Sequence, residues 1–355
     1  MNTAKIIKSI MNSIGGIGII VLIWSLCSFG PFVRSASSVK KLADHFYYME
    51  FKGDYQLESL LKQGGAESNS ELAIYIEQVL RGKKINKVFK EEVPLNTGCA
   101  ALSAFSPDGK KVFGRNYDWD NLNAAMIIKT NPRKGYKSIS TTQVDFLGFG
   151  ENYKPESFAN RYLAAAAIFI PLDGMNEKGL CISDLMAGDY EETNQNTGKG
   201  DVTTTLAIRG VLDFCANVPE AIAFLEKYDM HSVIGAAHHF AISDATGRMV
   251  VVEYVNNKMI VTEANAVTNH YLGVNKDLPN SENSIYRLDV LQKRLDEKKK
   301  LSEEDIKQAL YDIRAGQFNR NSKTWWRAVF NQNDLTVSYS LEENYEKSAE
   351  FNFKL

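Results

Sequence analysis

The first hydrophobic feature of the chain is an apolar run at residues 14–33, which follows two basic residues, Lys5 and Lys8. The run is long enough to cross a bilayer, which takes about 20 residues, and basic residues before an apolar stretch are typical of export signals. Because small residues follow at 35–38, we expect residues 1–38 to be a signal peptide or a retained membrane anchor. The protein is therefore expected to be exported and extracytoplasmic, either secreted or associated with the membrane through residues 14–33.

The pattern from residue 39 to about residue 90 is typical of helices. Apolar residues recur at positions 72, 75, 76, 79 and 80, which form one face at helical spacing. Asn69 or Ser70 can cap this helix at its start, and Gly82 can end it. We therefore expect a mainly helical segment ahead of residue 98.

At Cys99 the pattern changes from helices to strands. Residues 99–105 are small and apolar, residues 106–109 form a strong turn signal, and residues 111–119 form the returning strand of a hairpin. Further elements are predicted as strands at 165–170, 179–185, 239–263 (a three-strand meander), 324–331, 335–340 and 349–354, and as helices at 203–215, 219–228 and from the capping box Ser302-x-x-Asp305 to about 313. Since helices and strands are grouped and do not alternate one for one, we expect an α+β layered sandwich.

Composition limits the classes of partner more than it limits the fold. The chain has 355 residues, of which 44% are hydrophobic and 24% charged, and this length allows one large domain or two modest ones. The formal net charge is only -2, with 41 basic and 43 acidic residues. Such a balance gives no electrostatic reason to expect nucleic acid as a partner.

Cysteines and histidines show no spacing that is typical of a metal site. The four cysteines are Cys27, Cys99, Cys181 and Cys215, and none of them belongs to a close C-x-x-C pair. His238 and His239 are adjacent in a predicted strand, where neighbouring side chains face opposite ways. We therefore expect neither a metal nor another cofactor.

Cys99 is the residue whose surroundings point to chemistry. A cysteine nucleophile needs a base, and none of the histidines lies in a cysteine-protease signature. A cut before Cys99 would supply a base, because the new α-amine has a pKa of about 7.7–8.0 and is attached to the nucleophile itself. Gly98 has no side chain to block attack of the Cys99 sulfur on its carbonyl.

Cys99, followed after fifteen residues by Arg115-Asn116-Tyr117-Asp118, resembles the start of the choloylglycine hydrolase group of N-terminal-nucleophile hydrolases. That group includes bile salt hydrolases, penicillin V acylases and related acyltransferases. Segments 174–180 and 267–269 are similar to the group as well, so the resemblance spans residues 99–355. It implies a four-layer αββα sandwich as the catalytic domain at 99–355, preceded by a helical propeptide at 39–98.

The resemblance also implies roles for single residues. Cys99 would be the nucleophile and, through its amine, the general base. Asp118 would hold that amine, and Arg115 would favour the thiolate as a fixed nearby cation. Asn269 would donate its side-chain amide to the oxyanion. Arg287 would orient Cys99 and Arg115 or help to bind substrate.

Three further residues are expected to bind substrate. Met186 stands where bile salt hydrolases usually carry an asparagine. If this position contributes only its backbone N–H to the oxyanion hole, methionine can replace the asparagine. Tyr117 and Trp119 share one side of their strand and either line the pocket or pack in the core. The long leader before Cys99 is similar to that of the self-cleaving members of the group.

The expected reaction is hydrolysis of a linear, non-peptide amide of a small N-acyl compound through an acyl-thioester on Cys99. Candidate substrates are bile-acid conjugates, phenoxyacyl amides, N-acyl homoserine lactones and fatty-acyl amides. Two alternatives stay open: an acyltransferase with the same nucleophile, and an unprocessed, membrane-anchored binding protein without catalysis. A homo-oligomer is possible, and no nucleic acid is expected.

Overall fold

We describe the fold from a computed structural model, which describes residues 30–80, 98–150, 152–188, 190–274, 282–318, 322–341 and 349–355. Residues 1–29 lie outside the described residues, and so does most of the apolar run predicted to span or approach a membrane. None of the helices in the described ranges is both long enough and apolar enough to cross a bilayer.

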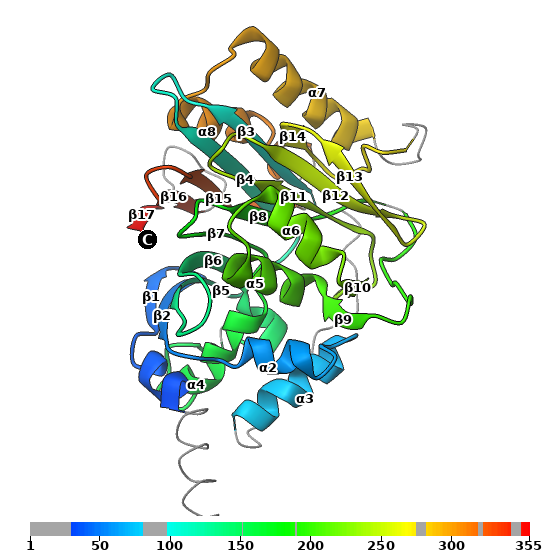
Figure 1. The fold of residues 1–355 in the computed structure, drawn as a ribbon. Coiled ribbons are helices and arrows are strands. Elements are labelled where there is room, and N and C mark those ends of the chain that lie inside the picture. The colour runs from blue at the N-terminus through cyan, green and yellow to red at the C-terminus, as the bar shows by residue number, and fades with distance from the viewer. Residues whose placement is uncertain are drawn as a thin grey trace, which may run out of the picture.

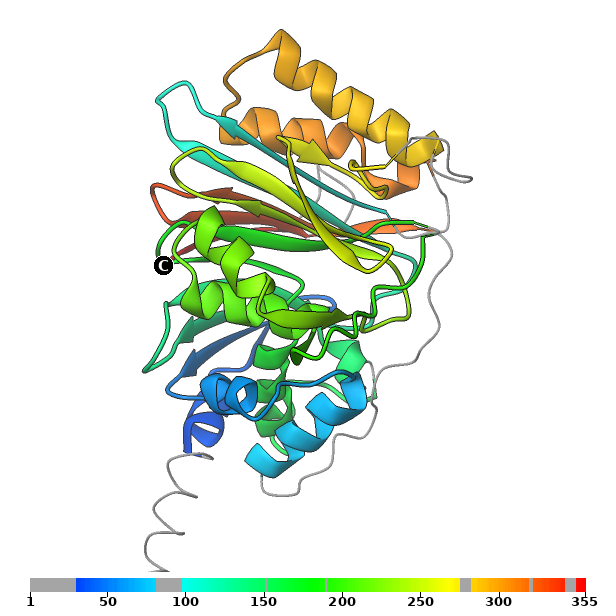
Figure 2. The ribbon, with the colours of Figure 1, turned by 45° about the vertical axis from the view of Figure 1, so that its right-hand side comes forward.

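Two twisted sheets lie face to face at the centre of the molecule (Figures 1 and 2). The larger sheet contains, in spatial order, β1 (Lys40–Ala43), β2 (Phe46–Lys52), β5 (Ala125–Asn131), β6 (Ser138–Gln143), β7 (Asp173–Asn176), β8 (Cys181–Met186), β11 (His238–Ser243), β12 (Met249–Val255) and β13 (Lys258–Glu263). The smaller sheet contains β14 (Ala266–Val267), β3 (Cys99–Phe105), β4 (Lys111–Trp119), β15 (Lys323–Asn331), β16 (Thr336–Leu341) and β17 (Ala349–Lys354). A separate parallel pair joins β9 (Gly200–Thr203) to β10 (Tyr228–His231).

Helices cover the outer face of each sheet and so complete four layers. The larger sheet is covered by α5 (Thr204–Phe214) and α6 (Val218–Leu225), and the smaller sheet by α7 (Glu282–Glu297) and α8 (Glu303–Asp312). The other helices are α2 (Leu57–Lys62), α3 (Asn69–Val79), α4 (Arg161–Ala164) and α9 (Ala315–Phe318), with 3-10 turns at Val144–Leu147 and Ala165–Phe169. Hydrophobic cores fill all three spaces between these layers. The arrangement is the αββα sandwich that the sequence predicts.

Local sequence signals explain several of these elements. The Thr203 side chain caps α5 by accepting from the Leu206 N–H at 3.2 Å. Ser302 and Asp305 form the predicted capping box at the start of α8. A Cβ on Gly114 would lie 2.4 Å from a methyl carbon of Ile306. A residue without a side chain is therefore what lets α8 pack closely on β4.

The leader differs from its predicted helical form over its first part. Helices α2 and α3 form as predicted, but residues 40–43 and 46–52 are strands. Strand β2 pairs in parallel with β5, from Phe46 opposite Ala125 to Lys52 opposite Asn131. Its run of aromatic residues suits a strand that is buried on both faces, where neither helical nor alternating periodicity is needed. The leader is therefore part of the larger sheet.

A second element differs from its predicted form. Residues 165–170 were expected to be a strand, whereas Ala165–Phe169 is a 3-10 turn that continues α4. All five residues of this turn are fully buried. A short buried apolar run does not distinguish strand from helix by its periodicity, and alanine has the highest helix propensity.

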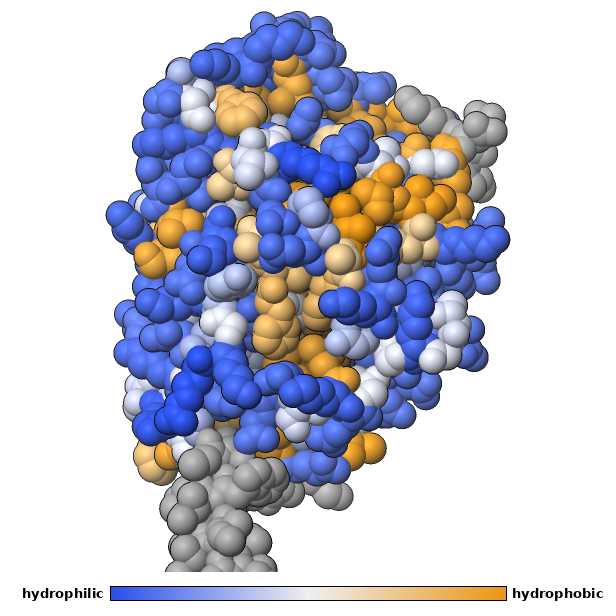
Figure 3. All heavy atoms as spheres, viewed as in Figure 1, coloured by the Kyte–Doolittle hydropathy of each residue, from blue (hydrophilic) through white to orange (hydrophobic). Residues whose placement is uncertain are grey.

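Hydrophobic side chains also gather at the surface beside β12 and β13 (Figure 3). Strand β13 is the last strand of the larger sheet, and its Val261 is 37% exposed. Exposed apolar surface on an edge strand can mark contact between copies of a chain. The homo-oligomer nevertheless stays a prediction.

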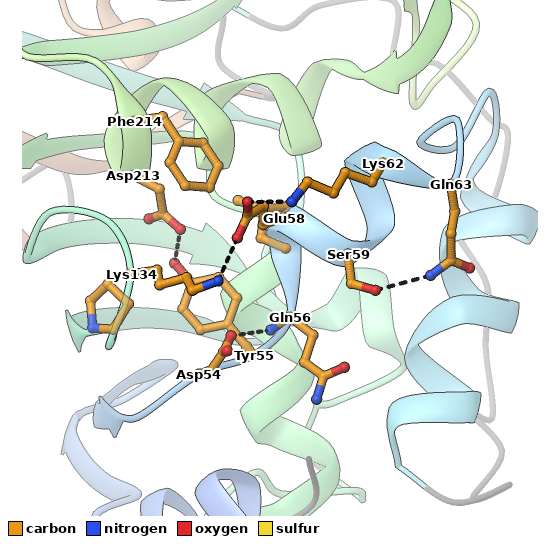
Figure 4. Close-up of a pocket in the computed structure, with 12 residues that line it drawn as sticks. Asp54, Tyr55, Gln56, Glu58, Ser59, Lys62, Gln63, Lys134, Asp213 and Phe214 are labelled. Carbon is orange, nitrogen blue, oxygen red and sulfur yellow. Dashed lines mark hydrogen bonds and ion pairs between the residues drawn. The ribbon is translucent and has the colours of Figure 1, made fainter. Parts of the chain in front are cut away.

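Polar contacts also join the leader to the rest of the molecule. A cavity of about 330 Å³ lies between α2, the end of α5 and the loop that follows β5, and the residues that line it are drawn in Figure 4. There the Tyr55 hydroxyl donates to Asp213, and the Lys134 ammonium lies 3.0 Å from Glu58. Asp213 in turn pairs with Arg209 at 2.8 Å, and Tyr55, Asp213 and Arg209 are all buried. The leader is thus tied to the rest of the chain by buried as well as surface contacts.

Candidate active site

Cys99 begins β3, and its main chain lies in a closed set of hydrogen bonds. The Cys99 N–H donates to Asn269 Oδ1 at 2.6 Å, and the Cys99 carbonyl accepts from Arg287 Nη1 at 3.0 Å. The second nitrogen of the guanidinium, Arg287 Nη2, donates to the same Asn269 oxygen at 2.8 Å. Residues from β3, α7 and the segment after β14 therefore fix the backbone of Cys99 on both sides.

Asp118 lies in β4 beside the bond that precedes Cys99. Its Oδ1 accepts from the Thr324 hydroxyl at 2.6 Å, whereas its Oδ2 is 3.9 Å from Arg287 Nη1 and accepts no hydrogen bond from any described residue. Burial raises the pKa of Asp118 to about 6, although Arg287 and the Thr324 hydrogen bond act in the opposite direction. Asp118 Oδ2 can therefore accept a hydrogen bond from a further donor.

Gly98 packs closely against the side chains of Asp118 and Arg287. A Cβ on Gly98 would lie 3.1 Å from Asp118 Oδ2 and 3.3 Å from each of Arg287 Nη1 and Nη2. The carboxylate and the guanidinium thus lie next to the Gly98–Cys99 bond. This is where a new α-amine would appear if that bond were cut.

Arg115 lies on the other side of β4, toward the space between the sheets. It is fully buried, donates from Nη2 to the Asp184 carbonyl at 2.9 Å, and places Nε 3.3 Å from Asp173 Oδ2. Its guanidinium carbon is 4.8 Å from the centre of the Tyr117 ring. Strand alternation therefore directs Arg115 and Tyr117 to one face of the sheet and Asp118 to the other.

The Cys99 thiol is not activated in the uncut chain. Burial raises its pKa to about 11, the positive charge of Arg115 lowers it, and the negative charge of Asp118 raises it again. The thiol is therefore protonated at neutral pH. The residues around it supply a fixed cation, but no described residue beside the thiol supplies a neutral amine as base.

A pocket next to the Cys99 side chain is mainly apolar. It is lined by Cys99, Arg115, Tyr117, Trp119, Phe146, Leu172, Asp184, Met186, Val233, Ile234 and His238. Tyr117, Trp119 and Met186, the three residues expected to bind substrate, all lie here, and Tyr117 also stacks on Trp326 with ring centres 3.9 Å apart. The cavity volume is about 20 Å³, room for about one water molecule. A substrate therefore needs the pocket to widen.

Asn269 and Met186 meet in a way that the sequence did not suggest. Asn269 Nδ2 donates to the Met186 carbonyl at 2.7 Å, so one of its two N–H groups is engaged by the backbone. Met186, which replaces the asparagine of bile salt hydrolases, therefore contacts the site through its main-chain carbonyl. The oxyanion role of Asn269 stays a prediction.

Several residues at the site were not found from the sequence. Asp173 pairs with Arg115, Thr324 binds Asp118, and Asp184 and His238 line the pocket. Asn116, which belongs to the recognised motif, faces away from the pocket and donates to the Leu310 carbonyl of α8 at 2.7 Å. These residues come from separate strands, and no local spacing links them to Cys99.

Comparisons with known proteins identify the family of the chain. The family model described as "Acyl-coenzyme A:6-aminopenicillanic acid acyl-transferase" matches residues 105–346, which begin just after Cys99. A curated relative, the bile salt hydrolase/transferase of Clostridium perfringens, is 28% identical over 181 residues, which are 47% of this chain and 51% of the relative. This chain thus spans about half the length of the curated relative that it matches.

Solved structures show the same fold. A mutant of the conjugated bile acid hydrolase from Clostridium perfringens matches with a TM-score of 0.53 and 16% identity, over 72% of this chain and 92% of the other. A second variant of that hydrolase matches with a TM-score of 0.51 and the same identity and coverage. At this identity the likeness concerns the fold alone. Because the family model covers more than half of the sequence, the chain belongs to the acyl-coenzyme A:6-aminopenicillanic acid acyl-transferase family, within the choloylglycine hydrolase and penicillin V acylase-like group of N-terminal-nucleophile hydrolases.

Proposed function

We propose that this protein is an amidase that hydrolyses the linear carbon–nitrogen bond of small N-acyl amides, with Cys99 as nucleophile after the Gly98–Cys99 bond is cut. One observation carries the proposal. The Cys99 N–H donates to Asn269, the Cys99 carbonyl accepts from Arg287, and Asp118 Oδ2 lies next to Gly98. The Cys99 side chain faces an apolar pocket that Arg115 also lines. The residues on the main-chain side of Cys99 could hold a new α-amine, and the pocket on its side-chain side could hold an acyl group.

The cut itself is a transfer of the Gly98 acyl group from nitrogen to sulfur. The Cys99 sulfur attacks the Gly98 carbonyl carbon, a C–S bond forms, and the C–N bond breaks. The thiol proton goes to the departing nitrogen, which becomes the α-amine. Water then hydrolyses the thioester, which frees the thiol and leaves a carboxylate on Gly98.

In the mature protein the same cysteine would attack the substrate. The α-amine, held by Asp118, takes the thiol proton and later activates the water that hydrolyses the acyl-thioester. The Arg115 charge favours the thiolate, and Asn269 can donate an N–H to the tetrahedral oxyanion. Arg287 holds the Cys99 carbonyl and so keeps the nucleophile in place. No metal or organic cofactor is invoked.

The lining of the pocket points to the kind of acyl group. Trp119, Phe146, Leu172 and Ile234 offer aromatic and aliphatic surface next to Cys99. An aromatic or alkyl acyl group would bury apolar area there, at roughly 25 cal/mol per Å². Hydrophobic N-acyl amides are therefore the substrate class that we propose.

The experiment that tests the activity is a panel of N-acyl amides with acyl groups of different size, incubated with the purified protein with and without an added acceptor amine. A hydrolase releases the free acid in both cases. An acyltransferase, the second candidate because of the family model, forms a new amide when the acceptor is present. Absence of any acyl product across the panel would contradict the proposal and favour a binding protein without catalysis.

The leader should stay bound after the cut. Strand β2 is paired with β5 along seven residues, and Phe46, Met49 and Phe51 are fully buried. We therefore expect the N-terminal and 257-residue C-terminal fragments to co-elute in gel filtration and to separate only in denaturant. Elution of a folded C-terminal fragment on its own would contradict this expectation.

Export is also proposed, on the strength of the apolar run at residues 14–33. Residues 30–33 are the described part of that run, and there Phe32 is fully buried and packs on Phe51 with ring centres 4.9 Å apart. Removal of residues 1–38 would delete this contact, at a cost of roughly 3–5 kcal/mol for a buried phenylalanine. Retention of the segment as an anchor is therefore favoured over its cleavage after residue 38.

A further inference from the structure

A chain of three hydrogen-bonded side chains lies beside the Cys99 pocket. His238 Nδ1 is 2.9 Å from Asp184 Oδ1, and His238 Nε2 is 2.9 Å from the Ser232 hydroxyl. Asp184 and His238 line the pocket, and both are buried. Asp184 lies in β8, His238 begins β11, and Ser232 lies in the loop that leads into β11. The hydrogen bonds therefore join this loop to the two strands.

One assignment of protons gives each of these three side chains a hydrogen-bond partner. The Nδ1–H of neutral His238 donates to Asp184, the Ser232 O–H donates to Nε2, and the Ser232 oxygen accepts from backbone N–H groups. Those groups are the N–H of Ile234 at 3.2 Å and the N–H of Ala236 at 2.9 Å. Ser232 is therefore the point around which the loop at residues 232–237, hereafter the pocket loop, is folded.

The arrangement has the order of a Ser–His–Asp triad, but the position of the serine favours another role. In hydrolases that use this triad the serine attacks the substrate. Here the Ser232 oxygen is occupied by two backbone donors of its own loop. The side chains that the loop presents to the pocket are those of Val233 and Ile234.

Val233 and Ile234 form one wall of the pocket. They are only 4% and 6% exposed, and they form a small hydrophobic cluster against which Trp119 and Met186 pack. Since the cavity beside Cys99 is about the size of one water molecule, any acyl group must displace this wall or fit against it. The position of the pocket loop therefore decides which acyl groups can reach Cys99.

The leader holds the other side of the same loop. Asn69 Nδ2, at the start of α3, donates to the Val233 carbonyl at 2.6 Å. Just before α3, the Ala66 N–H donates to the Asp201 carbonyl at 2.9 Å, and a Cβ on Gly65 would lie 1.7 Å from that carbonyl. The leader backbone therefore rests on β9, and the partner strand β10 runs directly into the pocket loop.

We propose that the pocket loop is the specificity-determining wall for the acyl group, that His238 is the positioning residue that sets it, and that Asn69 makes the leader part of this wall after the cut. The proposal rests on the proposed amidase function. A loop held from two sides presents Val233 and Ile234 in one place. Loss of either support lets the wall move, which changes binding of long acyl groups more than attack by Cys99.

The test compares kcat and KM of His238→Gln and Asn69→Ala with wild type on a series of N-acyl amides of increasing acyl length. We expect the ratio of kcat/KM between the longest and the shortest acyl group to change by roughly tenfold, mainly through KM. His45→Gln is the control for the first variant, because the His45 ring contacts the Asn123 carbonyl and does not line the pocket. Gln78→Ala, an exposed position on α3, is the control for the second.

The outcomes separate this proposal from the activity on which it rests. If wild-type protein turns over no amide of the series, the proposed function fails and this inference fails with it. If wild type is active and both variants keep its acyl-length profile, the amidase stands and the role of the loop is wrong. Should His238→Gln lower the melting temperature too far for assay, Asn69→Ala and Ile234→Ala decide the result, since both leave the buried Asp184–His238 pair in place.

Discussion

Replacing Cys99 with alanine is expected to leave the chain at its full length of 355 residues and to abolish amide hydrolysis. Both the cut and the turnover use the same sulfur, and an alanine side chain has no nucleophile. Removal of an essential nucleophile typically lowers turnover by roughly 10⁴-fold or more. The measurement is release of the free acid from an N-acyl amide, together with the mass of the purified protein.

A matched control for this variant is Cys181→Ala. Cys181 is also buried and free, but it lies in β8 away from Asp118, Asn269 and Arg287. It should keep both processing and activity, with a loss of stability on the order of 1 kcal/mol for a small buried side chain. Turnover by Cys99→Ala within tenfold of wild type would show that another residue is the nucleophile.

Changing Asp118 to asparagine is expected to keep the fold and to lower turnover by roughly 10²–10³-fold, the usual cost of losing one preorganised polar partner. Asparagine has the same shape and keeps an oxygen for the Thr324 hydroxyl. It loses the negative charge that would hold the α-amine of Cys99. The measurement is kcat on an N-acyl amide, with circular dichroism to confirm that the fold is retained.

Asp213→Asn is the control for this change. Burial also raises the pKa of Asp213 to about 6, but its carboxylate pairs with Arg209 at 2.8 Å and accepts from Tyr55, and it does not line the Cys99 pocket. It should therefore keep most of the activity. Equal losses in the two variants would show that the effect comes from removing a buried carboxylate and not from contact with Cys99.

Asp118 also predicts how the cut depends on pH. Its pKa in the uncut chain is about 6, above the ordinary value of 3.8, so the carboxyl is neutral below about pH 6 and charged above it. Because folding raises the pKa of Asp118, its ionisation lowers the stability of the uncut chain between about pH 3.8 and about pH 6, and the full cost remains above pH 6, where a new amine beside the carboxylate would relieve it. The cut should therefore be slower below about pH 6, and Asp118→Asn should lose this dependence.

The parts of the fold that were predicted correctly are those with local signals. The hairpin that carries Cys99 and Asp118 has a strong turn between two strands, and the meander β11–β13 has turns at both of its connections. The capping box at Ser302 marked the start of α8. In each case, residues that are close in sequence are also close in space. A short stretch of sequence therefore contains the residues that determine the element.

The parts that were missed depend on distant pairing. Strand β2 is held by β5, which lies more than 70 residues later in the chain, and nothing near Phe46 indicates that partner. In the same way, Asp173, Asp184 and His238 are placed beside Arg115 and Cys99 by the order of strands in the larger sheet. Cys99, Arg115 and Asp118 could be proposed from the sequence because they share one hairpin and because their spacing resembles that of a known family.

The central claim is that a cut at the Gly98–Cys99 bond creates the base that Cys99 needs. Intact-mass and N-terminal analysis of protein that is turning over an N-acyl amide tests it most directly. The account predicts that the active species contains a 257-residue fragment whose first residue is Cys99 with a free amine. Full activity in a preparation that consists of one uncut polypeptide would contradict it.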